Sequence, residues 1–326
     1  MSAQNTTNSV DSELLLATCK ATAESLRLDI LRVLSVESFG VMELCHIFNT
    51  AQPGMSHHLK ILSSSGLLQT RREGNSIFYR RAAVSSENPI NGFISSLFQS
   101  IDRVVLSPEI RKRCQQIHRE RAQNSKAFFK KKAAKLKQNQ NLIAQFSHYE
   151  SCITDLLSKT SPLNLNRVIE VGPGESDLIG FLSGRFDSLL AVDNSDEMLN
   201  RTRDKVRLLN LGNVEFFSGE LSDLEASHRA DLVVLNMVLH HLPAPGGVFK
   251  SAHQILEPGG QLLIVDLCSH NQDWARDTCG DLWLGFDPND LDQWAKDANL
   301  EKGQGAYLGL RNGFQVQIRL YQQKSN

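Results

Sequence analysis

The sequence predicts an α/β chain of two domains, an N-terminal winged helix-turn-helix and a C-terminal doubly wound, Rossmann-like sheet, which a helical linker joins. Three observations predict this fold class. The chain has 326 residues, of which 41% are hydrophobic, and this is enough to fill two cores. Short amphipathic segments and a basic hairpin come first, and apolar strands alternating with helical segments come later. We expect the domains at residues 12–84 and 141–326, with the helical dimerisation and linker region at 85–140.

The first domain is predicted from its order of helices, turn and hairpin. Residues 12–48 carry apolar side chains at three- and four-residue spacing, which predicts short amphipathic helices. A turn at 49–52 leads into a helix that begins near Pro53. Residues 69–80 then alternate as a hairpin that turns at 73–75.

This segment is similar to the winged helix-turn-helix of the ArsR family of bacterial regulators. In that family the helix with a Ser-His-His-Leu-Lys run enters the major groove of DNA, and the basic hairpin meets the phosphate backbone. The resemblance implies double-stranded operator DNA as the partner. The side chains that it places on DNA are Ser56, His57, His58 and Lys60 on one helix face, with Arg71, Arg72 and Asn75 on the hairpin.

No metal site is expected. Metal-sensing ArsR members carry two cysteines that flank one residue at the start of the third helix, and the aligned positions here are 40–42, Gly-Val-Met. The 6 cysteines are scattered without a close pair, so neither a zinc ribbon nor a disulfide framework is indicated. The adjacent His57 and His58 point about 100° apart on a helix, so they do not chelate one ion together.

The linker combines an apolar stripe with a basic run. Apolar residues between 90 and 104 recur at helical spacing, which is typical of packing on the winged domain. In ArsR relatives the helix at this place pairs two subunits, so we expect a homodimer. The formal net charge of -1 hides a run of basic residues at 107–137, opposed there by two glutamates. A solvated connector helix is favoured, and nonspecific attraction to DNA stays open.

The second domain opens with a nucleoside-binding pattern. The apolar pair before Glu170 predicts a strand, which leads into the turn Gly172-Pro173-Gly174. A helix and a second strand follow, and that strand ends at Asp193, placed to bind ribose hydroxyls. The two acids are 23 residues apart, close to the roughly 20 that such units show.

The residues after the turn select the ligand. Glu175 and Asp177 stand where the next helix begins. Two carboxylates there favour the helix dipole but repel a diphosphate, so we expect a ligand without phosphate and with some positive charge. S-adenosylmethionine (SAM) fits both conditions.

Downstream segments add a family resemblance. From about Phe128 onward the chain resembles class I SAM-dependent methyltransferases, whose first motif reads acid-x-Gly-x-Gly, although Ser176 stands at a position often filled by glycine. Segments near 193–199, 214–221, 231–242 and 256–266 follow in the family's order. The resemblance implies SAM or S-adenosylhomocysteine as cofactor. The implied binding residues are Glu170, Gly172, Gly174, Asp193, Asn194, Glu220, Leu221 and Asn236.

The end of the fourth strand bears on catalysis. It reads Asn236-Met237-Val238-Leu239, without the Asn/Asp-Pro-Pro-aromatic motif of nucleic-acid amino-methyltransferases, so methylation of DNA bases is not expected. His240 and His241 follow, and a histidine there is a candidate general base. Packing of the strand end remains an equal alternative. Cys268 and His270 follow the fifth strand and could meet these histidines, but a structural or substrate role is favoured over a metal site.

Two functions therefore stay open. Whole-chain resemblance is to ArsR regulators fused to a methyltransferase domain, which implies a regulator of methionine-cycle genes that reads SAM or S-adenosylhomocysteine. The alternative is an active methyltransferase of a small molecule with an attached regulatory domain. A metalloregulator carrying an unrelated enzyme lacks its ligands. No stretch reaches the roughly 18 apolar residues of a membrane span, and the polar N-terminus is no signal peptide, so we expect a cytoplasmic protein without membrane contact.

Overall fold

The computed structural model describes residues 2–324 apart from 36, 74–75, 83–88 and 160–163. Two compact units divide the chain: the winged unit, Met1–Glu120, and the sheet unit, Arg121–Asn326. Residues 85–140, which the sequence predicts as a separate linker, are shared between the two units, so the three-part division stays a prediction. No helix of the described residues is both long and apolar enough to cross a membrane.

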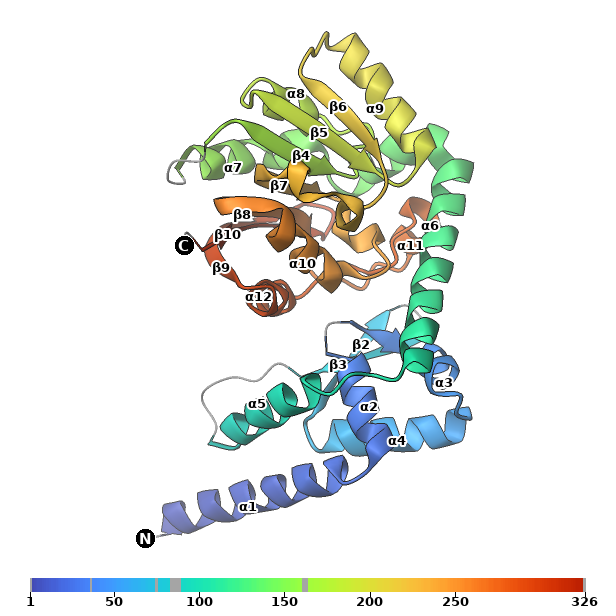
Figure 1. Cartoon of the computed structure of the whole chain (residues 1–326), viewed down its shortest axis with the longest axis vertical. Helices are drawn as coiled ribbons and strands as arrows, with labels where there is room; N and C mark the ends of the chain where they lie inside the picture. Colours follow the sequence, from blue (N-terminus) through green and yellow to red (C-terminus); the bar gives the residue numbers. More distant parts are fainter. Residues whose placement is uncertain (1, 36, 74–75, 83–88, 160–163, 325–326) are drawn as a thin grey trace. The chain divides into compact units, whose positions relative to one another are not determined.

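The winged unit combines helices with a small antiparallel sheet of strand order β1-β3-β2 (Figure 1). Its core is made by apolar side chains of all its helices. In chain order its elements are α1 (Ser2–Thr22), α2 (Ser25–Val33), β1 (Phe39–Gly40), α3 (Val41–Phe48), α4 (Gln52–Ser64), β2 (Leu68–Glu73), β3 (Ser76–Arg81), α5 (Pro89–Asp102) and the first part of α6 (Pro108–Ile143).

The predicted helix-turn-helix is formed by α3 and α4. Asn49 ends α3 with a left-handed backbone, at φ 49°, which turns the chain toward α4. A proline in the first turn suits the start of α4, because its missing N–H would have no helical partner there. Met55, Leu59 and Leu62 recur along one face of α4 and are buried in the core. The opposite face is left for polar side chains.

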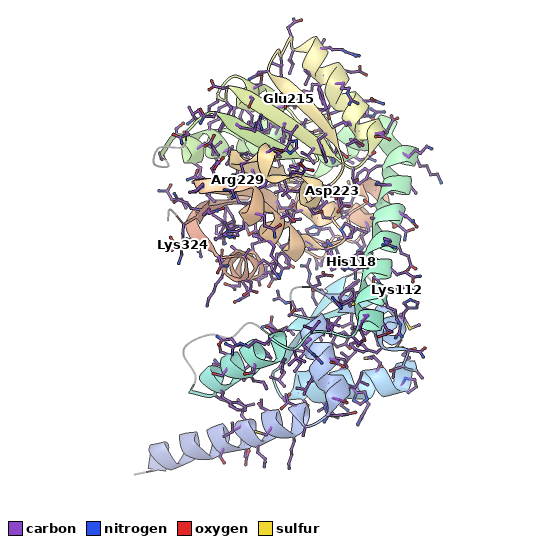
Figure 2. All side chains as sticks on the ribbon, viewed as in Figure 1. Lys112, His118, Glu215, Asp223, Arg229 and Lys324 are labelled. Carbon is purple, nitrogen blue, oxygen red and sulfur yellow. The ribbon has the colours of Figure 1, made fainter. Side chains whose placement is uncertain are left out.

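The linker segments pack more closely than a solvated connector would. Ile94 and Phe98 of α5 are buried in the core of the winged unit. In α6, Arg113 Nη1 donates a hydrogen bond to the carbonyl oxygen of Ile47 at 2.7 Å. His118, on the same helix as Lys112 (Figure 2), stacks on Phe39 with ring centroids 5.8 Å apart. Part of the basic run is therefore structural.

The sheet unit is a doubly wound sheet with helices on both faces (Figure 1), which confirms the predicted fold class. Seven strands lie in the order β6-β5-β4-β7-β8-β10-β9. The elements after α6 are α7 (Phe146–Lys159), β4 (Arg167–Val171), α8 (Leu178–Ser183), β5 (Ser188–Asp193), α9 (Asp196–Leu208), β6 (Val214–Ser218), η1 (Leu221–Asp223), η2 (Ala226–His228), β7 (Ala230–Asn236), η3 (Leu239–His241), α10 (Pro245–Ile255), β8 (Leu256–Leu267), α11 (Trp274–Cys279), α12 (Pro288–Asp297), β9 (Leu300–Gly309) and β10 (Gln315–Gln323).

The topology of this sheet fixes where a ligand can bind. Strands β4 to β8 are parallel, and β10 runs antiparallel between β8 and β9. The central parallel strands β4 and β7 are buried along nearly their whole length, as expected of parallel strands that are covered on both faces. Between β4 and β7 the strand order reverses. Open α/β sheets bind ligands at such a reversal, outside the carboxyl ends of the strands.

Candidate functional site

The turn after β4 requires glycine at two positions. Gly172 has φ +62° and Gly174 has φ +50°, a backbone region that L side chains rarely adopt. A Cβ atom at Gly172 would lie 2.3 Å from Cγ2 of Val238, and one at Gly174 would lie 2.9 Å from Cε of Met198. The two glycines therefore let the backbone after β4 approach both the segment that follows β7 and the start of α9.

Glu170, at the end of β4, is a fully buried carboxylate. Burial raises its pKa to about 7, although the Ser176 hydroxyl and the Lys205 ammonium both lower it. Neither carboxylate oxygen has a partner at full hydrogen-bonding geometry among the described residues. An unpaired buried acid is costly, so the pocket is better suited to a ligand that brings hydrogen-bond donors or positive charge.

Asn236 lies across the sheet reversal from Glu170. Its Nδ2 is 3.4 Å from Oγ of Ser176, and its Oδ1 is buried without a partner in the described part of the chain. Tyr149 of α7 is 3% exposed and lies beside this amide; burial raises the pKa of its phenol, and the contact with Asn236 lowers it. Sequence reasoning placed Asn236 near the ligand but gave no signal for Tyr149, an aromatic residue on an ordinary amphipathic helix.

The predicted ribose and adenine residues meet at the ends of β5 and β6. Oδ1 of Asp193 accepts a hydrogen bond of 2.8 Å from the Ser195 amide. Burial raises the Asp193 pKa to about 6, while the Ser195 amide and the Lys126 ammonium lower it. Asn194 Nδ2 donates to Oε1 of Glu220 at 3.2 Å, and Leu221 beside it is buried. The structure thus brings together the residues expected to surround a nucleoside.

The two carboxylates at the start of the helix after β4 are not free to repel a ligand, contrary to the expectation from sequence. The carboxylate of Glu175 is paired with Arg201 at 2.6 Å, and that of Asp177 is paired with Lys205. Because α9 supplies a cation to each acid, the two carboxylates repel an anionic ligand much less than their sequence positions suggest. Glu170 is the buried acid of this region, and burial raises its pKa to about 7.

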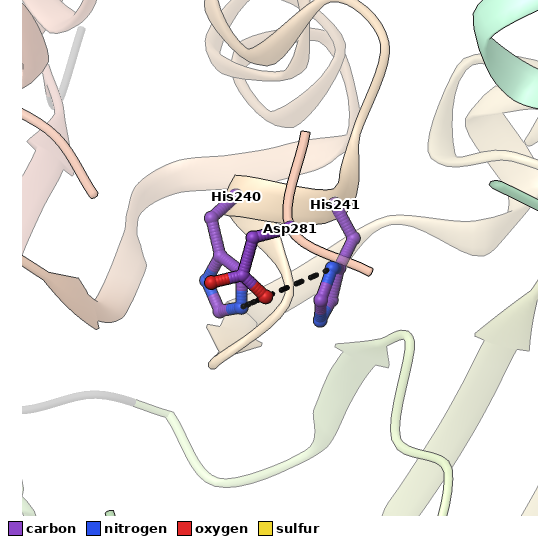
Figure 3. A group of neighbouring side chains, drawn as sticks. All are labelled: His240, His241 and Asp281. Carbon is purple, nitrogen blue, oxygen red and sulfur yellow. Dashed lines mark ion pairs between the residues drawn. The ribbon is translucent and has the colours of Figure 1, made fainter. Parts of the chain in front are cut away.

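His240 and His241 lie in η3, just beyond β7, and both are buried (Figure 3). His240 Nδ1 is 2.8 Å from Oδ1 of Asp266, at the end of β8. His240 Nε2 is 3.7 Å from Oδ1 of Asp281, and His241 Nδ1 is 3.9 Å from the same oxygen. The sequence offers no expectation that Asp281 meets these histidines, and Cys268, a candidate for that place from its sequence position, is not part of this group.

The pKa values of the two imidazoles are shifted in opposite directions. Burial lowers the pKa of His240, but the carboxylates of Asp266 and Asp281 outweigh it and bring that pKa to about 9. Burial and the neighbouring His240 lower the pKa of His241 well below its usual value. His240 is thus the charged member and His241 the neutral one. Their role as general base stays a prediction.

The candidate DNA face lies on α4 and the hairpin. Ser56, His57 and Lys60 are exposed, but His58 is half-buried and its Nδ1 lies 3.4 Å from Oε2 of Glu24. The expectation of one common face is therefore wrong for His58, since residues two positions apart point about 200° apart on a helix. On β2, Arg72 is exposed and Arg71 is half-buried, whereas Asn75 lies outside the described residues.

Comparison with known families assigns both units. A family model described as a methyltransferase domain matches residues 116–303, more than half of the chain. The chain belongs to this methyltransferase family. A second model, for bacterial regulatory proteins of the arsR family, matches residues 24–70. The predicted fusion is confirmed, and SAM or S-adenosylhomocysteine is the cofactor of the methyltransferase domain.

Curated relatives match only part of the chain. A carboxy-S-adenosyl-L-methionine synthase of Shewanella piezotolerans is 31% identical over 109 residues, 32% of this chain and 44% of the relative. An arsenite methyltransferase of Halobacterium salinarum is 31% identical over 110 residues, 30% of this chain and 28% of the relative. A demethylmenaquinone methyltransferase of Listeria welshimeri is 28% identical over 120 residues, 36% of this chain and 46% of the relative. The chain spans less than half of the length of these relatives.

Solved structures of similar fold share less sequence identity with this chain than the curated relatives do. A SAM-dependent methyltransferase of Clostridium acetobutylicum has a TM-score of 0.47 and 14% identity, covering 60% of this chain and 99% of that chain. The magnesium protoporphyrin IX methyltransferase of Synechocystis with bound SAM has a TM-score of 0.43 and 17% identity, covering 54% of this chain and 77% of that chain.

Proposed function

We propose that this chain is a DNA-binding transcriptional regulator whose methyltransferase domain takes SAM or S-adenosylhomocysteine as its effector. The observation that carries the proposal is the union of an arsR-family domain and a methyltransferase domain on one chain. The exposed side chains of α4 support it, because Ser56, His57 and Lys60 offer hydrogen bonds and charge on a helix suited to the major groove. Control of methionine-cycle genes follows from the resemblance of the whole chain to regulators of that type.

In this proposal the effector binds at the carboxyl ends of β4 to β7. Glu170 and the glycine turn face the methionine part, where the buried carboxylate attracts the ammonium and sulfonium charges of SAM. Asp193 and Asn194 bind the ribose, Glu220 and Leu221 border the adenine, and Asn236 presents its unpartnered oxygen to the ligand. S-adenosylhomocysteine lacks the sulfonium charge, so the ionisation of Glu170 affects the two ligands differently.

In this proposal the protein binds DNA as a homodimer. Leu15 and Leu16 of α1 and Phe93 of α5 are exposed apolar side chains, and these two helices contact each other. A second copy of this chain on that face would bury them and would match a two-fold symmetric operator. A monomer mass by light scattering at micromolar protein concentration would contradict this part.

An active methyltransferase acting on a small molecule is the second candidate. It is favoured by the curated relatives, which carry the names of enzymes. Against it, His240 and His241 are buried, at 2% and 5% exposure, so the candidate bases have little access to an acceptor in this conformation.

The experiment that separates the two uses DNA selected by the full-length protein from a random-sequence library. The affinity for this DNA is measured by fluorescence anisotropy without ligand, with saturating SAM and with saturating S-adenosylhomocysteine. A regulator changes its DNA affinity with at least one ligand by about 5- to 150-fold, the usual range of coupling between two sites. An unchanged affinity, together with production of S-adenosylhomocysteine from SAM in a small-molecule extract, would favour the enzyme.

A further inference from the structure

Three side chains that can bind a metal ion converge beyond the carboxyl end of β7 (Figure 3). His240 and His241 come from η3, and Asp281 follows α11, about forty residues later in the chain. Their ligand atoms all lie within 4.8 Å of one another. Within the part of the chain that the structure describes, this is the one group of at least three histidine, cysteine or acidic side chains with that property.

The separations between these atoms fit a small tetrahedral ion. Zinc–ligand bonds of about 2.0–2.1 Å place the ligand atoms of a tetrahedron roughly 3.4 Å apart. Asp281 Oδ1 is 3.7 Å from His240 Nε2 and 3.9 Å from His241 Nδ1. The carbonyl oxygen of Gly280 is 3.2 Å from the same His241 nitrogen and offers a fourth ligand. The three side-chain ligand atoms lie within 4.8 Å of one another, so a modest contraction toward the ion would complete the coordination sphere.

The carboxylate of Asp266 already orients His240 for metal binding. Asp266 is fully buried, and its Oδ1 lies 2.8 Å from His240 Nδ1. Its Oδ2 accepts a hydrogen bond of 3.3 Å from the His240 amide. A metal-bound histidine typically donates its second N–H to a carboxylate, which fixes the tautomer and turns the other nitrogen to the ion. His240 Nε2 is the nitrogen turned toward Asp281.

The backbone around the cluster is held in place. The amides of Leu282 and Trp283 both donate to the carbonyl oxygen of His240, at 3.0 and 3.1 Å. Phe129 of α6 packs edge-on against the His241 ring, with centroids 5.0 Å apart. The ligand atoms are therefore presented by a fixed frame, shielded from water.

The geometry points to a divalent-cation site in the sheet unit, with Zn²⁺ as the ion that fits best. Its ligands are His240 Nε2, His241 Nδ1 and Asp281 Oδ1, with the Gly280 carbonyl at the fourth position. Two imidazoles and one carboxylate suit zinc among the common cations, because Mg²⁺ and Ca²⁺ prefer oxygen ligands alone. Bound there, the ion links η3 to the segment after α11. This role goes beyond the proposed function and does not depend on it.

Binding exchanges protons for the metal. His241 Nδ1 contacts a carbonyl oxygen in the metal-free form, so its N–H proton moves to Nε2, which is buried without a partner in the described residues. Any proton on His240 Nε2 is released to solvent. The two imidazoles then bind as neutral ligands, and the Asp281 carboxylate brings one negative charge to the dication.

The test is a zinc titration of the full-length chain. Metal-stripped protein is titrated with Zn²⁺ in competition with a chromophoric chelator. We expect one tight equivalent per chain in the wild type. Separate His241→Gln and Asp281→Asn substitutions lower its affinity by more than about 100-fold, because even loss of an outer partner costs about 10- to 100-fold. His228→Gln, which changes a half-buried histidine of the same unit outside this cluster, leaves the zinc affinity unchanged.

A second readout on the wild type guards against variants that fail to fold. Co²⁺ in place of Zn²⁺ gives the intense visible bands of a four-coordinate ion when nitrogen and oxygen ligands surround it. A thiolate-to-cobalt charge-transfer band would instead place the ion on a cysteine and overturn the proposal. The absence of a tight zinc equivalent in the wild type would do the same. Equal zinc affinity in folded His241→Gln or Asp281→Asn protein would also contradict it.

Discussion

Glu170 is the residue whose burial has the clearest thermodynamic consequence. Its pKa rises from 4.5 to about 7 in the folded protein because burial disfavours the carboxylate. A raised carboxyl pKa means that stability is fully present below about pH 4.5 and is lost as the pH rises through about 7. The loss is on the order of 3 kcal/mol. Without ligand, Glu170→Gln should remove this loss.

Urea unfolding of the ligand-free protein at pH 5 and pH 8 checks the Glu170 prediction. The free energy of unfolding should fall more steeply with pH in the wild type than in Glu170→Gln. Glu215→Gln, at an exposed position of β6 (Figure 2), serves as the matched control and should retain the wild-type slope. Parallel slopes in wild type and Glu170→Gln would show that burial of this carboxyl does not affect folding.

Gly172 supplies a second residue-scale prediction. Alanine there meets both a positive φ and a contact of 2.3 Å with Val238. The strained backbone alone costs about 1–3 kcal/mol, and Val238 must move in addition. Gly172→Ala should therefore lower the thermal midpoint of the sheet unit and weaken SAM binding in calorimetry. Gly212→Ala has nothing within 4 Å of the added atom and should do neither; equal effects of the two changes would disprove the steric argument.

At the scale of elements, α4 and the hairpin should affect DNA binding in different ways. Arg72→Ala on β2 removes the phosphate contact expected of this side chain, so it should weaken binding to all sequences and reduce the salt slope by about one unit. His57→Ala on α4 should instead change the preferred base at one position of a selected operator. Binding of the two variants to a library of operator variants at several salt concentrations checks this. A sequence-specific effect of Arg72→Ala would reverse the assignment.

Elements whose residues are contiguous along the chain were predictable from the sequence. The strand before Glu170, the glycine turn and the strand ending at Asp193 form one continuous unit, so their spacing carries the information. Asp281 and Tyr149 were not predictable, because only the folded sheet brings them to the carboxyl ends of β7 and β8. The same reason explains the ion pair of Glu175 with Arg201, which lies on α9. Charge positions along a sequence do not reveal tertiary partners.

At the scale of the whole molecule, we expect two modules, one that binds DNA and one that binds the cofactor, each of which influences the other. Asp193→Ala should abolish cofactor binding, because it removes the carboxylate expected at the ribose. The same variant without ligand should retain the DNA affinity of the wild type, since the helix-turn-helix belongs to the other unit. Loss of DNA affinity in ligand-free Asp193→Ala protein would contradict the two-module assignment.

The central claim is that cofactor occupancy and DNA binding are coupled. Calorimetric titration of the protein with SAM, and separately with S-adenosylhomocysteine, tests it when each titration is repeated with selected operator DNA bound. Coupling is reciprocal, so an effector must bind DNA-free and DNA-bound protein with affinities that differ by about 1–3 kcal/mol. We expect that difference for at least one of the two ligands. Identical affinities with and without DNA, for both ligands, would contradict the regulatory account.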